Sequence, residues 1–211
     1  MNTPGTSRNG SRSWPPTSRS QWVRPALPFI AGSLAILVSL AGFPFARGQA
    51  APSEYQLKAA FLFNFAKFID WPPGSFTGPQ SPFTICVLGQ DPFGRVLDDS
   101  LQGKAIGNQP LTIRRLKDKT EARRCQMVFV SSSESAHLAE ILESLRGASV
   151  LVVGETSGFA AAGGTIEFTL EDNRVRFTIN TDAADRAGLM LSSKLLALAK
   201  LVHDAGHSKG V

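Results

Sequence analysis

Large apolar side chains dominate one stretch of the sequence, residues 53–73, SEYQLKAAFLFNFAKFIDWPP. Ser53 and Gln56 stand three residues apart, which is the spacing of a helix capping box. Pro72 and Pro73 cannot donate to a helix, and each favours an extended residue before it. We therefore expect a largely buried helix of about four turns, a spine against which a sheet packs.

Asn64 and Lys67 are the polar exceptions in the apolar body of this helix. Residues three apart share a helix face, so the two side chains lie together. Two interpretations stay open: they form the one water-facing edge of the helix, or they contact a ligand or a partner.

Short apolar runs then alternate with segments of helical character. Runs bounded by turn residues are typical of buried strands, and a 3.6-residue period indicates a helix. The sequence predicts a helix at 92–101, with Asp91 as its cap, and another at 134–145, capped by Ser132 or Ser133. This alternation favours a largely parallel α/β sheet. The predicted strands cover residues 83–88, 111–116, 125–131 and 149–153.

Two further strands, 165–170 and 174–180, flank the turn residues Asp172 and Asn173. A tight turn there fixes the register of a β-hairpin and puts every apolar pair on one face, with Glu167 diagonal to Arg176 on the other. The expected pairs are Glu171 with Arg174, Leu170 with Val175, Thr169 with Arg176, Phe168 with Phe177 and Ile166 with Ile179.

The last segment, residues 183–203, predicts a helix bent at Gly188. Thr181 or Asp182 would cap it, and its apolar stripe would be Leu191, Leu195, Leu198 and Val202. The fold class expected is therefore one three-layer-like α/β domain. Its sheet is mixed but mostly parallel, with a C-terminal β-hairpin and flanking helices.

The first 50 residues do not read as part of this domain. A segment with five arginines and no acid surrounds a charge-free run at 25–46, and small residues follow it. These are the parts of a secretory signal peptide, with cleavage expected after Ala50 and the mature domain at 51–211. An uncleaved membrane anchor is the alternative, since about 20 apolar residues span a bilayer. The basic segment is long, so the true start could lie further in.

Charge separates the two parts in the same way. The chain carries 22 basic and 17 acidic residues, a net charge of +5. Removing the five arginines of the leader leaves 17 basic against 17 acidic residues. A neutral mature domain offers no electrostatic basis for binding nucleic acid.

Two cysteines, Cys86 and Cys125, lie in or beside apolar strand runs. Export to an oxidising compartment favours a disulfide between adjacent strands, and two buried thiols are the alternative. Without a CxxC pair, neither thiol catalysis nor a zinc site is expected.

No catalytic set can be assembled from the remaining polar residues. The three histidines are scattered, and no Ser–His–acid spacing is present, so we expect no metal, no cofactor and no enzyme activity. Asn180 follows a strand and either caps the next helix or contacts a ligand. Residues 158–164, GFAAAGG, form a turn before the hairpin, and Phe159 there is either structural or faces a partner.

Four blocks of the chain together resemble the YfiR-like family of small periplasmic regulators. They are YQLKAAFLFNFAKFIDWP at 55–72, CVLGQDPFG at 86–94, GFAAAGGTIEF at 158–168 and VRFTINTDAADRAGLMLSSKLLALAKLV at 175–202. The resemblance spans the whole mature domain in order. It implies a single α/β domain, a homodimer, and a disulfide between Cys86 and Cys125. The second cysteine pair of some relatives is missing here.

The resemblance also implies a non-enzymatic function. YfiR-like proteins bind the periplasmic part of an inner-membrane diguanylate cyclase and hold it inactive, and an OmpA-like, peptidoglycan-associated lipoprotein can sequester them. Cyclic di-GMP and biofilm formation then rise. On this reading the partner surface lies around Phe159, Ile166 and Phe168, although the last two could equally be core.

A second function remains open, a periplasmic module that binds a small ligand for another receptor. A deep pocket near Asn64, Lys67 and Asn180 would favour it.

Overall fold

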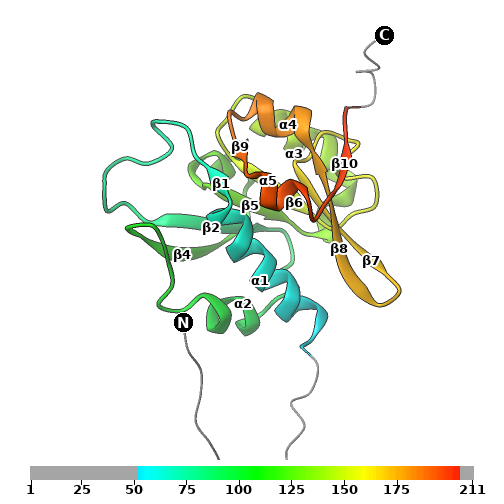
Figure 1. Cartoon of the computed structure of the whole chain (residues 1–211), viewed down its shortest axis with the longest axis horizontal. Coiled ribbons are helices and arrows are strands. Elements are labelled where there is room, and N and C mark those ends of the chain that lie inside the picture. Colours follow the sequence, from blue (N-terminus) through cyan, green and yellow to red (C-terminus); the bar gives the residue numbers. More distant parts are fainter. Residues whose placement is uncertain (1–51, 205–211) are drawn as a thin grey trace, which may run out of the picture. The chain divides into compact units, whose positions relative to one another are not determined.

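The structure, a computed structural model, describes residues 52–204, so the expected signal peptide lies outside the described residues. Figure 1 shows a twisted sheet with helices on both faces. The sheet has eight strands in the order β10-β8-β7-β6-β5-β2-β4-β3. Strands β4, β2, β5, β6 and β7 run parallel, as do β8 and β10, and within this sheet only the pairs β7–β8 and β3–β4 are antiparallel. The mixed, mostly parallel sheet confirms the fold class.

The elements follow one another as helix, strands and short helices. The helices are α1 (Glu54–Lys67), α2 (Arg95–Leu101), α3 (Leu138–Leu145), α4 (Thr181–Arg186) and α5 (Ser193–Leu196), with 3-10 turns η1 (Lys119–Arg124) and η2 (Ser132–His137). The strands are β1 (Ile69–Asp70), β2 (Phe83–Leu88), β3 (Ala105–Ile106), β4 (Gln109–Leu116), β5 (Met127–Val130), β6 (Leu151–Gly154), β7 (Ile166–Glu171), β8 (Arg174–Asn180), β9 (Met190–Leu191) and β10 (Lys200–Val202).

Two hydrophobic cores lie on opposite faces of the sheet. In β2, Ile85 and Val87 belong to the core that contains Leu62 and Phe65 of α1. Cys86 and Leu88 of the same strand belong to the other core, which contains Ile141 of α3. Because successive strand residues point to opposite faces, this alternation places α1 and α3 in separate layers. The domain is therefore a three-layer α/β structure.

The first helix begins as the sequence predicts. Ser53 is its N-cap, and the reciprocal bonds of the capping box to Gln56 are both present. The helix ends at Lys67, five residues before the first proline, because Ile69 and Asp70 form β1 and pair with β9.

The hairpin register is confirmed residue by residue, from the pair Glu171–Arg174 to the pair Ile166–Ile179. Asp172 and Asn173 both have positive φ angles, 49° and 59°. Asp and Asn tolerate this conformation better than most residues do, which suits the tight turn.

The predicted C-terminal helix at 183–203 is wrong. Gly188, with a φ of 68°, follows the end of α4. The chain then forms β9 against β1 and β10 parallel to β8, with only the short α5 between them. The supposed apolar stripe also fails, since the side chain of Leu198 is 69% exposed.

Two other helices are shorter than predicted. Asp91 does not cap α2, which begins at Arg95 after Gly94; its carboxylate accepts from the Phe93 N–H and from the Arg115 guanidinium. The first half of the predicted helix at 134–145 is the 3-10 turn η2, so α3 begins at Leu138.

A disulfide joins Cys86 of β2 to Cys125, which lies just before β5. The two strands are neighbours in the sheet, so the bond links adjacent strands as expected. None of the helices among residues 52–204 has the length and apolar character that crossing a membrane requires.

Candidate functional site

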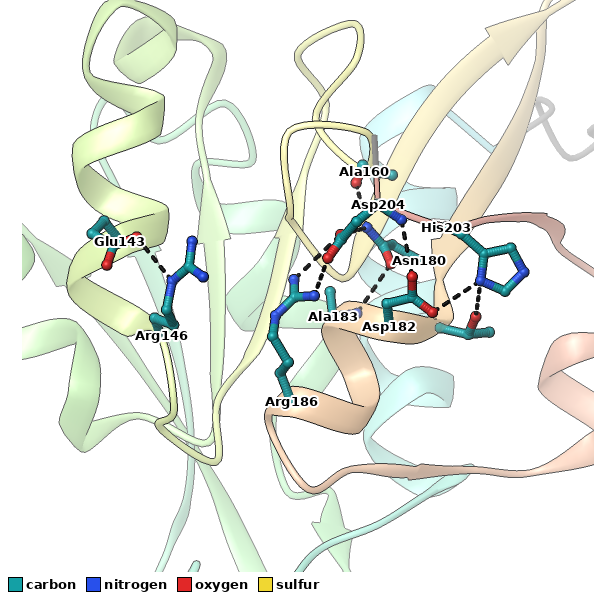
Figure 2. Close-up of polar contacts among 10 residues, drawn as sticks. Glu143, Arg146, Ala160, Asn180, Asp182, Ala183, Arg186, His203 and Asp204 are labelled. Carbon is teal, nitrogen blue, oxygen red and sulfur yellow. Dashed lines mark hydrogen bonds and ion pairs between the residues drawn. The ribbon is translucent and has the colours of Figure 1, made fainter. Parts of the chain in front are cut away.

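A cleft of about 240 Å³ lies between α3 and α4, beside the start of β6. Figure 2 shows Arg146, at the end of α3, and Arg186, on α4, on the two sides of this space. The inner wall is apolar, from Leu142, Val150 and Val152. Small residues form most of the rest of the lining, and they are Ala139, Gly147, Ala148, Ala162, Gly163, Ala183 and Ala187.

The two arginines of the cleft are held differently. Arg146 donates from Nε to Glu143 Oε2 at 2.9 Å, and both side chains of this pair are about two-thirds exposed, at 65% and 66%. Arg186 is 37% exposed and is ion-paired with Asp204, the residue that follows β10 and His203. The cleft therefore presents two guanidinium groups, each with a carboxylate beside it.

Asn180 connects this cleft to the end of the chain. It is fully buried and caps α4, since its Oδ1 accepts from the Ala183 N–H at 3.0 Å. Its Nδ2 donates to the Ala160 carbonyl at 2.7 Å and to Asp204 Oδ1 at 2.8 Å (Figure 2). The helix-cap interpretation of Asn180 is confirmed, and both N–H groups of its side chain donate to the protein.

Asp204 is the acidic centre of this network. Burial acts to raise the pKa of its carboxyl group, but the hydrogen bonds from Asn180 and Arg186 outweigh burial and hold that pKa below its ordinary value. Its backbone N–H donates to Asp182 Oδ2 at 3.1 Å, and Asp182 Oδ1 lies 2.9 Å from His203 Nδ1. The segment after β10 is thus fastened to the start of α4.

The other sequence-predicted contact residues, Asn64 and Lys67, lie on α1. No hydrogen bond or ion pair among residues 52–204 joins either of them to Asn180. Lys67 is exposed, with its Nζ 5.4 Å from the centroid of the Phe63 ring. Neither residue lines the cleft near Asn180, which lies between α3 and α4, so a ligand or partner contact by Asn64 and Lys67 stays a prediction.

The residues expected around a partner surface are buried. Phe159 and Ile166 are 0% exposed and Phe168 is 2% exposed. Phe159 belongs to the core under α3, whereas Ile166 and Phe168 belong to the core under α1. The three side chains therefore share no surface in this structure, and the exposed apolar residue of the hairpin is Leu170, at 52%.

Glu167 has a different role from the one its register suggested. Its side chain does not reach Arg176 but accepts from the N–H groups of Gly158 and Ala160, both at 3.0 Å. Together with the bond from Asn180 to Ala160, this fixes the loop at residues 158–164 from both sides.

Sequence reasoning missed a buried ion pair. Lys58 of α1 is 4% exposed, and its Nζ lies 2.7 Å from Glu155 Oε2 and 2.5 Å from Glu54 Oε1. Burial alone would lower the pKa of Lys58, but its hydrogen bonds to the two carboxylates outweigh burial and raise it. Tyr55 donates to Glu155 at 3.4 Å. Glu155 directly follows β6, so the pair ties α1 to the carboxyl end of a central strand.

The arginines of the cleft can bind an anion, but the cleft has no group of side chains arranged for catalysis. Its described lining contains arginines, one glutamate and one threonine hydroxyl, without a nucleophile beside a base. Among residues 52–204, no cluster of three or more His, Cys, Asp or Glu side chains is arranged to hold a metal ion.

The described residues form a three-layer α/β domain with a cleft between α3 and α4. The sequence profile of the YfiR/HmsC-like family matches residues 55–200, nearly all of the described domain. The chain therefore belongs to the YfiR/HmsC-like family. This membership supports a periplasmic regulator of the YfiBNR type in general terms. No match was found among curated proteins.

Solved structures show distant similarity of fold. A conserved domain protein from Vibrio cholerae matches with a TM-score of 0.50 and 10% identity, over 72% of this chain and 61% of that one. An ABC domain in complex with L-Trp from Streptococcus pneumoniae gives 0.46 and 9%, over 70% and 60%. The substrate-binding protein CD0873 from Clostridium difficile gives 0.41 and 13%, over 69% and 58%. This chain thus spans about three-fifths of the length of each.

Proposed function

We propose that this protein is a non-enzymatic periplasmic regulator that binds and represses an inner-membrane diguanylate cyclase, and so limits cyclic di-GMP and biofilm formation. The observation that carries the proposal is the match to the YfiR/HmsC-like family across residues 55–200. The Cys86–Cys125 disulfide supports it, because disulfides persist in oxidising compartments such as the periplasm.

Repression requires a difference in affinity. The regulator must bind the inactive state of the cyclase more tightly than the active state, because a ligand with equal affinity for both shifts nothing. An OmpA-like, peptidoglycan-associated lipoprotein that sequesters the regulator would reverse repression by mass action. We also propose that the protein acts as a homodimer and uses neither a cofactor nor nucleic acid.

The contact surface we propose is the hairpin and the loop before it, around Phe159, Ile166 and Phe168. Since these three side chains are buried, they would shape the surface rather than touch the partner in this conformation. Leu170, near the hairpin tip, supplies the exposed apolar contact. The buried centre of an interface is more apolar than the rest of the surface, and an exposed leucine suits such a centre.

Deletion of the gene tests the proposal. In a strain that encodes a membrane diguanylate cyclase with a periplasmic domain, we expect cyclic di-GMP to rise and the tagged regulator to co-purify with that cyclase. Leu170→Glu should abolish co-purification, whereas Leu198→Glu, at a leucine that is even more exposed and lies outside the hairpin, should not. Unchanged cyclic di-GMP in the deletion strain would contradict the regulatory function.

Export is tested separately. We propose cleavage after Ala50 by a signal peptidase, so the N-terminal sequence of the periplasmic protein should begin at Ala51. A full-length protein in the membrane fraction would instead show an uncleaved anchor.

A second candidate function is a ligand-binding sensory module for another receptor. The observation that favours it is the cleft between α3 and α4, where two guanidinium groups flank an apolar wall. The two functions are compatible, because a ligand that changes a regulator's affinity for its partner is a coupling between two sites.

A further inference from the structure

We propose that the cleft between α3 and α4 binds a small branched aliphatic monocarboxylate, with its carboxylate between Arg146 and Arg186 and its alkyl body against Leu142, Val150 and Val152. The inference rests on the second candidate function. It does not depend on the binding of a cyclase, so a failure here leaves the first function standing.

The size of the cleft sets the scale of the ligand. Its volume is about 240 Å³. A dry apolar cavity of about 150 Å³ is known to hold one benzene molecule. The space therefore suits a body of four to six heavy atoms, on the order of one benzene ring, with a charged group added.

The lining determines the character of the ligand body. Apart from Thr165 and the charged residues Glu143, Arg146 and Arg186, the described walls are alanine, glycine, leucine and valine, and no aromatic ring lines the cleft among residues 52–204. An aromatic ligand would have no ring to stack on, whereas a branched alkyl group gains contact with several small side chains at once.

The charge around the cleft selects a monoanion. Arg146 and Arg186 contribute two positive charges, and Glu143 and Asp204, their partners, contribute two negative ones. Because these charges cancel, an anion gains a net attraction only when a guanidinium leaves its carboxylate, and the exposed pair Arg146–Glu143 can free one positive charge, which matches a monoanion. A single carboxylate can be bound by the fork of donors on a guanidinium group.

Arg146 is free to change partner. Its pair with Glu143 is exposed on both sides, and ion pairs of that kind are weak. Arg186 is bound more firmly, through Asp204 to the buried Asn180. A ligand that shares Arg186 would weaken its hold on Asp204, so binding in the cleft reaches the segment that follows β10.

The test is calorimetric titration of the purified mature protein with isovalerate, with isovaleramide as a neutral isostere and isopentyl phosphate as a dianion. We expect isovalerate to bind with a dissociation constant of about 1 mM or tighter. Each analogue should bind at least about tenfold more weakly, which corresponds to loss of one good ionic contact. Equal affinity for acid and amide, tighter binding of the phosphate, or no heat up to about 10 mM isovalerate would overturn the proposal.

Three variants test where the ligand binds. Arg146→Gln removes one guanidinium from an exposed position and should weaken isovalerate binding about tenfold. Ala187→Leu fills the slot and should abolish binding, provided that circular dichroism shows a folded protein. Arg174→Gln, an exposed arginine on the hairpin, is the matched control and should bind isovalerate normally. Normal binding by Arg146→Gln, or loss of binding in the Arg174 control, would contradict this placement.

Discussion

Lys58 is a charged residue whose buried ion pair holds α1 against the sheet. It stands between Leu57 and Ala59 on α1, and nothing in this local sequence marks it as a buried residue. Its partner Glu155 lies 97 residues away and reaches it only through the packing of α1 on the sheet. No local pattern carries that information, whereas the Ser53–Gln56 capping box is local and was predicted correctly.

Lys58→Met should therefore destabilise the protein strongly. The change leaves Glu155 buried without its counter-charge, and breaking a buried ion pair in this way costs about 3–5 kcal/mol. Urea denaturation of the variant measures this free energy of unfolding. Lys67→Met, at an exposed position of the same helix, is the control and should change it by less than about 0.5 kcal/mol. A Lys58→Met variant as stable as the control would show that the pair contributes nothing.

The same cluster predicts alkaline sensitivity. The pKa of Lys58 is raised in the folded protein by its carboxylate partners, and that of Tyr55 is raised by burial and by Glu155. A group whose pKa is higher in the folded state stabilises it fully below the unfolded pKa and loses that effect as pH rises. We expect unfolding free energy, followed by denaturant titration, to fall above about pH 10. The fall should be smaller in Lys58→Met, and an equal fall in both proteins would exclude Lys58 as its source.

Among the elements, the register of the hairpin was predicted correctly, whereas the C-terminal helix was predicted wrongly. The hairpin depends on a local turn at Asp172 and Asn173 and on the alternation of its strands. The segment after α4 instead forms strands that pair with residues far along the chain, β9 with β1 and β10 with β8. Local helical periodicity could not reveal those pairings, and long-range hydrogen bonds overrode it.

The candidate site was predicted only in part. Asn180 was singled out and does cap α4, but its link to Asp204 depends on the fold of the last strand, which the helix prediction had excluded. Arg146 and Arg186 lie 40 positions apart on two helices, and nothing in their spacing indicates a shared cleft.

The loop at residues 158–164 depends on two close backbone approaches to Phe159. A Cβ atom added at Gly164 would lie 2.1 Å from the Phe159 ring, and one added at Gly154 would lie 2.4 Å from it. Both glycines are therefore required for the buried ring to fit between them.

Gly164→Ala should destabilise the protein by about 1–3 kcal/mol, because overpacking forces the ring or the backbone to move. The melting temperature and the urea midpoint measure this loss. Gly78→Ala is the matched control, since an added Cβ there meets nothing within 4 Å, and we expect it to be neutral. Equal stability of the two variants would show that the loop accommodates the added Cβ atom without loss of stability.

At the scale of the whole molecule, one disulfide spans 39 residues and joins two central strands. Closing a loop of that length restricts the unfolded chain by about 3–4 kcal/mol. Replacing Cys86 and Cys125 together by alanine should lower the unfolding free energy by about that amount under oxidising conditions. In the presence of dithiothreitol the wild type should approach the variant, and a wild type unaffected by reductant would contradict the expected contribution.

The function proposed above is regulation of a diguanylate cyclase by binding. The most direct measurement of this is the rate of cyclic di-GMP synthesis by a membrane diguanylate cyclase from the same organism. The enzyme is reconstituted in proteoliposomes with its periplasmic domain exposed, and the mature protein is added. We expect a saturable decrease in that rate, which Leu170→Glu does not produce and Leu198→Glu does. A rate that stays constant at every concentration of the wild-type protein, while the two proteins remain folded, would contradict the central claim.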